Sequence, residues 1–193
     1  SAGGADVEAD DDYRERIHEA PERFSTAGPT GAYEYWAKTA NSGIIDVAIR
    51  SPAAGTVEIR PLLEGGKLPE QELLDTVKSI VSADKVRPLT DNVTVLAPEA
   101  VAYDINLTYY VDAGTSEATV KAAVTSAIDT YRLWQKSKIG RDINPSRLIA
   151  DIMAVPGVKR VNVTSPTFKE LTATQVAQEN STISAVLGGS EDE

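Results

Sequence analysis

The positions of apolar residues predict two helices and two strands in the first sixty residues. A short helix is expected over residues 13–19, and a second begins near Thr30, with apolar side chains three and four residues apart on one face. From Ile44 the apolar residues alternate with polar ones, and the alternation returns at Val57. Turn-forming residues separate the two stretches, so they are expected to pair as a hairpin.

A helix and a third strand complete the first predicted module. Pro69 suits the first turn of a helix that ends near Ala83, because Leu, Val and Ile residues form one stripe along it. Residues 85–91 contain a proline and are expected to form an ordered loop. Alternation at Val93 and Val95 indicates the next strand. The first module therefore has the order strand, strand, helix, strand.

The clearest strand signal lies at residues 101–111, where six apolar residues alternate with polar ones. A helical pattern follows over residues 116–136. A further helix is predicted over residues 144–155, because an Asn-Pro pair begins it and a Pro-Gly pair follows it. Residues 158–163 form a short returning strand, so the second module has the order strand, helix, helix, strand.

These patterns predict an α+β fold with two consecutive small α/β modules, an N-terminal helical segment and an extended C-terminal tail. The acidic N-terminal segment with its helices is expected to occupy residues 1–43, the first module residues 44–98 and the second module residues 99–165. Residues 166–193 are rich in Thr, Gln, Ser and Gly, and their apolar residues are too sparse for a core of their own. This tail is therefore expected to dock on another surface, such as a partner subunit.

Composition and charge narrow the class of protein. The 193 residues are 41% hydrophobic and 25% charged, as in ordinary globular proteins, and no apolar run reaches the length of a membrane span. The sequence has no Cys, which excludes disulfides and Cys-based zinc sites. The net charge of −10 is concentrated in residues 1–12 and in the last three residues, so no basic face is expected. Neither nucleic acid nor an anionic membrane surface is therefore an expected partner.

Three features resemble ligand-binding motifs, and each has a simpler explanation. His18 lies beside glutamates, and a metal site would need a second imidazole or converging carboxylates. The aspartates at 10–12 lack the glycine and closing glutamate of a calcium loop and are expected to cap a helix. Residues 65–67 are Gly-Gly-Lys, but Leu68 stands where a phosphate-binding loop needs Ser or Thr, so a turn is expected. No metal site and no cofactor are predicted.

Carboxylates near the longest predicted strand are the remaining candidates for catalysis. Asp104 and Asp112, with Glu99, would form a paired-carboxylate site only if the fold brought them together. Their positions in the sequence do not establish such convergence, and surface carboxylates are the simpler interpretation. No catalytic residue is therefore predicted.

Aromatic side chains give the one positive functional signal in the composition. Tyr33, Tyr35 and Trp36 lie on a helix that is too short to bury all three rings in its own module. Tyr110 falls on the polar side of its strand. Aromatic residues are favoured at protein interfaces because they bury a large area while keeping a polar group. These four residues are therefore candidate interface residues.

The string Lys-Val-Arg-Pro-Leu-Thr-Asp at residues 85–91 is the most specific motif in the chain. Other stretches accompany it in a fixed order and spacing, namely residues 4–16, 27–37, 45–47, 55–59, 93–95 and 101–103. Together these motifs resemble the baseplate J-like family of phage tail proteins. The resemblance covers residues 3 to about 111 well and the remainder more loosely.

The resemblance implies a structural baseplate wedge component of a contractile phage tail or a related contractile injection system, with no catalytic site. The implied partners are other baseplate wedge proteins and copies of the chain itself. The implied location is the tail baseplate of the virion, assembled in the cytoplasm of the bacterial host. In the family the Gly-Ala-Asp motif lies well inside the protein, so its position at residues 4–6 implies a C-terminal fragment. The isolated fragment is expected to be monomeric.

Two other classes of protein compete with this hypothesis. A small-molecule-binding α/β regulatory module would contain a closed apolar pocket with converging polar groups. An enzyme that uses Asp104 and Asp112 would bring both carboxylates into a deep cleft. The geometry around these residues therefore discriminates between the three hypotheses.

Overall fold

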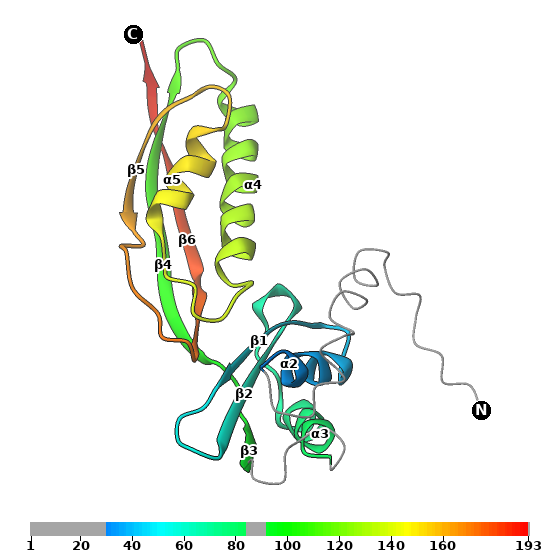
Figure 1. The fold of residues 1–193 in the computed structure, drawn as a ribbon. Helices are drawn as coiled ribbons and strands as arrows, with labels where there is room; N and C mark the ends of the chain where they lie inside the picture. The colour runs from blue at the N-terminus through cyan, green and yellow to red at the C-terminus, as the bar shows by residue number, and fades with distance from the viewer. Residues whose placement is uncertain (1–29, 84–91, 193) are drawn as a thin grey trace, which may run out of the picture. The chain divides into compact units, whose positions relative to one another are not determined.

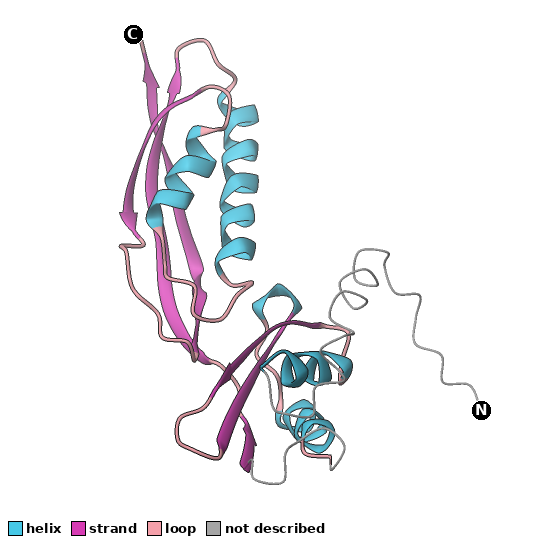
Figure 2. Cartoon of the chain, viewed as in Figure 1, coloured by secondary structure: helices cyan, strands magenta, loops and turns pink. Residues whose placement is uncertain are grey.

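The computed structural model describes residues 30–83 and 92–192, which form two compact units (Figure 1). The described residues of the first unit are those up to 63 together with 68–97, and the second unit takes in residues 64–67 and those from 98 onward. In the described residues each unit combines helices with one three-stranded sheet (Figure 2). The predicted α+β fold is therefore confirmed.

Several predictions fall outside the described residues. They are the helix at 13–19, the acidic residues at 10–12, His18 and the loop at 85–91.

The first unit packs two helices against a sheet of order β1-β2-β3. The strands β1 (Ile44–Arg50) and β2 (Thr56–Leu63) form the predicted antiparallel hairpin. The third strand, β3 (Asn92–Val95), pairs parallel with β2. The helices are α2 (Thr30–Thr39) and α3 (Gln71–Val81), and their apolar stripes lie where the sequence predicts them.

The core of the first unit joins both helices to the sheet. Tyr33 and Ala37 of α2 and Val77 and Val81 of α3 pack together with Ile59 of the central strand, and all five are buried. Because α3 adds a second packing surface to α2, the short helix buries more of its side chains than the sheet alone would allow.

The central strand β2 also carries a buried ion pair. Arg60 Nε and Arg50 Nε each donate to Glu58 Oε1 at 2.8 Å, and a second guanidinium nitrogen of Arg60 donates to the carbonyl oxygen of Ala97 at 2.6 Å. The hydrogen bond from Arg50 outweighs the effect of burial and holds the pKa of Glu58 below its ordinary value, with further help from Arg60. The charges on β2 are therefore balanced within the unit, as burial of ionised groups requires.

The second unit places two helices on one face of a sheet of order β5-β4-β6 (Figure 1). The central strand β4 (Glu99–Asp112) pairs antiparallel with β5 (Val158–Ser165) and parallel with β6 (Gln175–Glu191). The helices are α4 (Glu117–Gln135) and α5 (Pro145–Met153). The side chain of Asn144 accepts a hydrogen bond from the Ser146 amide and Pro145 occupies the first turn, so α5 begins as predicted.

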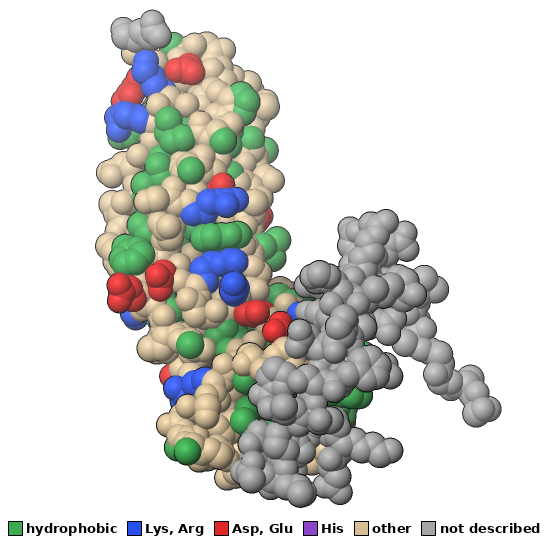
Figure 3. All heavy atoms as spheres, viewed as in Figure 1, with side chains coloured by type: hydrophobic (Ala, Val, Ile, Leu, Met, Phe, Trp, Pro, Cys, Tyr) green, Lys and Arg blue, Asp and Glu red, His purple; other side chains and the backbone are tan. Residues whose placement is uncertain are grey.

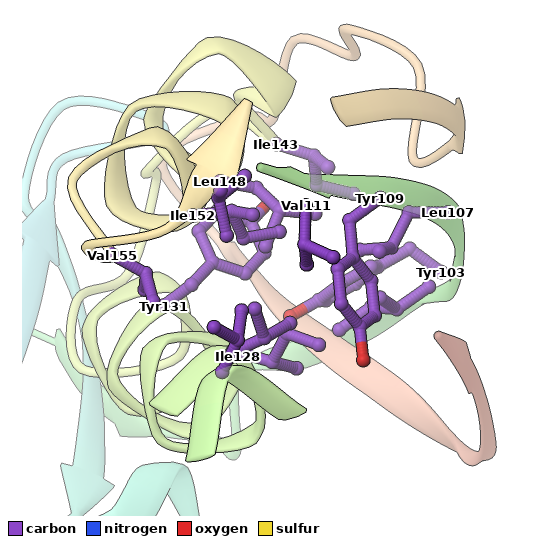
Figure 4. Packing of buried hydrophobic residues seen from close by; sticks show 14 of the residues in the cluster. Tyr103, Leu107, Tyr109, Val111, Ile128, Tyr131, Ile143, Leu148, Ile152 and Val155 are labelled. Carbon is purple, nitrogen blue, oxygen red and sulfur yellow. The ribbon is translucent and has the colours of Figure 1, made fainter. Parts of the chain in front are cut away.

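Alternate residues of β4 form the centre of the second core. Tyr109 and Val111 of β4 lie among Leu148 and Ile152 of α5 and Tyr131 of α4 (Figure 4), and each of the five is at most 1% exposed. The strict alternation seen in the sequence is therefore the packing pattern of this strand.

The main difference from the sequence prediction concerns the C-terminal stretch. It is extended, as predicted, but β6 is a 17-residue strand that pairs with β4 of the same chain from Glu99↔Gln175 to Asp112↔Glu191. Its apolar side chains Ile183, Ala185 and Leu187 pack against the core of the second unit. The expectation that this tail docks on a partner subunit is therefore corrected: its few apolar residues suffice because they complete a core that other elements have already built.

An ion cluster joins β6 to α4. Glu179 Oε1 accepts hydrogen bonds from Lys136 Nζ at 2.8 Å and from Arg132 Nη2 at 2.9 Å, and the Glu179 side chain is only 7% exposed. Burial acts to raise the pKa of Glu179, but the hydrogen bonds and charges of Lys136 and Arg132 outweigh it and lower that pKa below 4.5. The ionised form of Glu179 is therefore the form that holds the strand to the helix.

We expect Glu179→Gln to lower the free energy of unfolding of the second unit by about 1–3 kcal/mol at neutral pH, because charged hydrogen bonds are lost. The folded-state pKa is lowered, so the stabilisation is present above the unfolded-state pKa near 4.5 and is lost as the pH falls through the folded-state pKa. Urea denaturation of the unmodified chain and of Glu179→Gln, from pH 7 to pH 3, measures this difference in the free energy of unfolding. The difference between them should shrink in acid. A matched control is Asp129→Asn, which removes the more exposed partner of Arg132 and should have the smaller effect.

Candidate functional site

The four candidate interface aromatics divide between the core and the surface. Tyr33 is 3% exposed and belongs to the first core, and Tyr35 is 8% exposed. Trp36 is partly exposed, and its ring meets that of Tyr35 edge to face with 5.4 Å between centroids. Tyr110 is also partly exposed. A buried ring has little area to offer a partner, so the aromatic surface of this set lies on Trp36 and Tyr110.

Tyr110 is part of a cluster on the face of the second sheet that is turned away from α4 and α5. The guanidinium carbon of Arg160 lies 3.4 Å from the centroid of the Tyr110 ring. The same guanidinium forms an ion pair with Glu191, with Nε donating to Oε2 at 2.9 Å. The hydrogen bond that Arg160 donates to Glu191 lowers the pKa of Glu191 and raises the pKa of Arg160. The cluster of Tyr110, Arg160 and Glu191 therefore links β4, β5 and β6.

Gly188 makes room for the Tyr110 ring. A Cβ atom at this position would lie 2.5 Å from Cε1 and Cζ of Tyr110 and 2.8 Å from Cγ2 of Thr108. The backbone of β6 thus passes close to the Tyr110 ring, and glycine is the residue that leaves room for this approach. The sequence shows Gly188 and Arg160 but gives no sign that they meet Tyr110.

We expect Gly188→Ala to lower the free energy of unfolding by about 1–3 kcal/mol, because the added methyl group displaces the Tyr110 ring from beneath Arg160. In a Tyr110→Ala background the same change should cost clearly less, since the conflict with the ring is gone and only the contact with Cγ2 of Thr108 remains. A double-mutant cycle of thermal unfolding measures the coupling. Equal effects in both backgrounds would contradict the assignment of the ring contact.

A second partly exposed aromatic residue, Trp134, lies in the second unit, and the sequence analysis does not predict it as an interface residue. The guanidinium carbons of Arg141 and Arg147 lie 4.3 Å and 5.1 Å from the centroid of the Trp134 ring. Ile149 and Met153, one helical turn apart on α5, are exposed as well. Figure 3 shows basic, acidic and apolar side chains interspersed over one face of this unit. Trp and Arg are the residue types most enriched at the energetic centres of protein interfaces.

The candidate carboxylates do not converge. Glu99 and Asp112 lie at opposite ends of β4, and Asp104 and Asp112 are eight residues apart on it, roughly 26 Å at the usual rise of a strand. Asp104 is exposed and accepts a hydrogen bond from Asn180 Nδ2 at 2.6 Å. The strand therefore holds apart the residues that the carboxylate hypothesis needs to bring together.

The glycine-rich stretch before α3 is a turn, as predicted. The 3₁₀ helix η2 (Glu64–Gly66) contains Gly65 and Gly66 at φ values of 69° and 73°, in the left-handed region that favours glycine. The carbonyl oxygen of Gly66 accepts a hydrogen bond from Gln178 Nε2 at 2.7 Å. The positive φ values of these glycines set the path of the chain ahead of α3.

The described residues contain neither a cluster of metal ligands nor a helix that could span a membrane. Over 30–83 and 92–192, no group of three or more His, Asp or Glu side chains is arranged to hold a metal ion. Of the helices in those ranges, none combines the length and the apolar character needed to cross a membrane.

A shallow depression of about 500 Å³ lies between α4 and β6 and is open to solvent. It is lined by Tyr109, Glu117, Ala118, Lys121, Ala185, Val186 and Leu187. Its lining combines a few apolar side chains with one acidic and one basic side chain. The depression is open, whereas the binding pocket of a small-molecule regulatory module would surround most of its ligand.

Comparison with known proteins identifies the family. The model of the baseplate J-like central domain matches residues 25–97, and that of the baseplate J-like protein C-terminal domain matches residues 103–184. The two matches follow each other in sequence and together cover most of the chain. The chain therefore belongs to the baseplate J-like family, and the resemblance noted in the sequence is confirmed.

Individual relatives agree with this assignment. The chain is 33% identical over 187 residues to baseplate protein J of Escherichia phage P2, and the alignment covers 96% of this chain and 61% of that protein. Its fold matches a chain in the cryo-EM structure of the anti-feeding prophage (AFP) baseplate with a TM-score of 0.63 and 18% identity, covering 93% of this chain and 43% of the other. The chain thus spans less than two thirds of the P2 relative.

Proposed function

We propose that this protein is a structural wedge component of the baseplate of a contractile phage tail or a related contractile injection system. The observation that carries the proposal is the presence of the central and C-terminal baseplate J-like domains, in that order, in one chain. The similarity to a protein named for a phage baseplate and the shared fold with a chain of an injection-system baseplate support it.

The physical properties of the two units suit assembly rather than chemistry. Each unit has its own core of buried apolar residues, so each is a rigid body that can present a surface to a neighbour. Aromatic and arginine side chains are enriched at the energetic centres of interfaces, and the described surface has partly exposed aromatic residues at Trp36, Tyr110 and Trp134. These three positions are the interface residues that we propose. No bond in a substrate needs to be made or broken for this function.

The proposed partners are other baseplate wedge proteins and further copies of this chain in the assembled tail. The proposed location is the tail baseplate of the virion, reached by assembly in the cytoplasm of the bacterial host. The net charge of −10 and the interspersed charges of the surface argue against nucleic acid as a direct partner. The isolated chain is proposed to be a monomer that associates only with its neighbours in the tail.

Immunogold labelling of purified tails with an antibody against this chain tests the proposed function. Label confined to the baseplate is the expected result, and the same tails treated with an antibody that does not recognise this chain provide the control. Label on the tube or sheath, or tails that form normally without the chain, would overturn the proposal.

A further inference from the structure

The outer edge of β6 is unpaired within the part of the chain that the structure describes. In the order β5-β4-β6, β6 pairs with β4 on one side only. Alternate residues of such a strand direct their backbone N–H and C=O groups away from the sheet. Natural proteins usually protect an edge of this kind, because it is a template for another strand.

Two bulges divide this edge into three segments of regular pairing. The register of β6 against β4 shifts within residues 180–182 and again at Gly188. Between them, residues 183–187 pair without interruption from Ile105↔Ile183 to Tyr109↔Leu187. Bulges discourage pairing along the whole edge. The segment 183–187 itself has none of the charged residues or prolines that guard exposed edges.

The depression described above lies directly beside this segment. Ala185, Val186 and Leu187 line it from β6, and Ala118 and Lys121 line it from α4. A strand added to the edge would direct alternate side chains to the helix side of the sheet, where the depression of about 500 Å³ has room for more than one of them. The other side chains of that strand would lie beside Val186, which is 53% exposed.

We propose that residues 183–187 form a docking site for one extended strand of a partner polypeptide, which adds to the sheet beside β6. The proposal rests on the proposed function and names how one neighbour in the assembly is held. The partner segment must be extended, because only an extended chain has free N–H and C=O groups at the spacing of the backbone groups along this edge. The lining of the depression favours small apolar side chains at alternate positions of the bound strand.

A second copy of β6 fits this site poorly. In a pairing of two β6 edges, the side chains turned toward the helices would be Ile183, Ala185 and Leu187 of each copy. These side chains already pack against the core of their own unit, so they are not available to fill the depression of the neighbour. The partner strand is therefore expected to come from a different polypeptide segment.

The test uses the 193-residue chain and a short synthetic peptide of alternating Val and Thr with lysines at both ends. Backbone amide exchange, measured at millimolar peptide, should slow by about tenfold at alternate residues within 183–187. The same peptide methylated on alternate backbone nitrogens is the control and should give no protection, because it lacks the donors that pair with the edge. Unchanged exchange with the unmodified peptide, or equal protection by both peptides, would overturn the proposal.

A variant locates the site. Val186→Lys places a charge on the edge while keeping an exposed position, and it should weaken peptide binding by about tenfold or more. Leu133→Lys, at a similarly exposed residue of α4, is the matched control and should bind as the unmodified chain does. Equal peptide binding by the two variants would show that residues 183–187 are not the docking site. A dimer that forms without peptide and that Val186→Lys dissociates would show that the edge binds a second copy of this chain, and it would overturn the proposal of a different partner. Because this experiment uses no tails, it can fail while baseplate labelling succeeds, and the reverse.

Discussion

A chain that ends before Gln175 is expected to lose the cooperative unfolding transition of its second unit. β6 pairs in parallel with β4 along almost the entire length of β4. It also contributes apolar side chains to the core, and its Glu179 forms ion pairs with α4. Its removal exposes one edge of β4 and the core beneath it, a loss of about 5 kcal/mol or more, comparable to the whole stability of a small domain. The first unit has its own core and should keep its transition.

The two tryptophans report on the two units separately, which makes the truncation measurable. Trp36 lies in the first unit and Trp134 in the second, so a Trp36→Phe background isolates the emission of Trp134. Thermal unfolding followed by this emission should show no sigmoidal transition in the truncated chain. A chain shortened only by Asp192 and Glu193 is the control. A retained, cooperative Trp134 transition after deletion from 175 onward would show that β6 is dispensable.

The second large effect is expected from Ile152→Ala in α5. Ile152 is fully buried beside Leu148, so its truncation leaves a cavity and should lower the free energy of unfolding by about 2–5 kcal/mol. Ile149, on the same helix, is 38% exposed, and Ile149→Ala should change stability by no more than about 0.5 kcal/mol.

The pair of α5 variants is matched because both replace Ile by Ala in one helix, so the gain in helix propensity is shared. Urea denaturation followed by Trp134 emission gives both values. A similar loss in the two variants would contradict the packing of α5 against β4, whereas a large difference in the expected direction supports it.

Local periodicity was enough to predict most strands and helices of both units. The six alternations at 101–111 identify β4, and the Asn-Pro pair identifies the start of α5. The pairing of β6 within the second sheet could not be predicted from periodicity, for two physical reasons. Its bulges interrupt the alternation, and its partner β4 is far away in the sequence, so the pairing leaves no local signal.

The candidate interface could be predicted only in part. The sequence predicts Tyr33 and Tyr35 as interface residues because their helix is expected to be too short to bury three aromatic rings, but Tyr33 packs in the core that α2 shares with α3. Trp134 is not predicted as an interface residue, because the two arginines that flank its ring lie in the following loop and in α5. In both cases the environment of the aromatic ring is set by contacts between separate helices and loops. The spacing of residues within one helix does not predict such contacts.

The parallel pairing of β4 with β6 has a consequence for synthesis. β4 is the first strand of its sheet to be synthesised, and its neighbour β6 follows only after α4, α5 and β5 have been translated. A prematurely terminated product would therefore expose an open sheet to chaperones and proteases. Synthesis of β6 is thus the step that completes the sheet of the second unit.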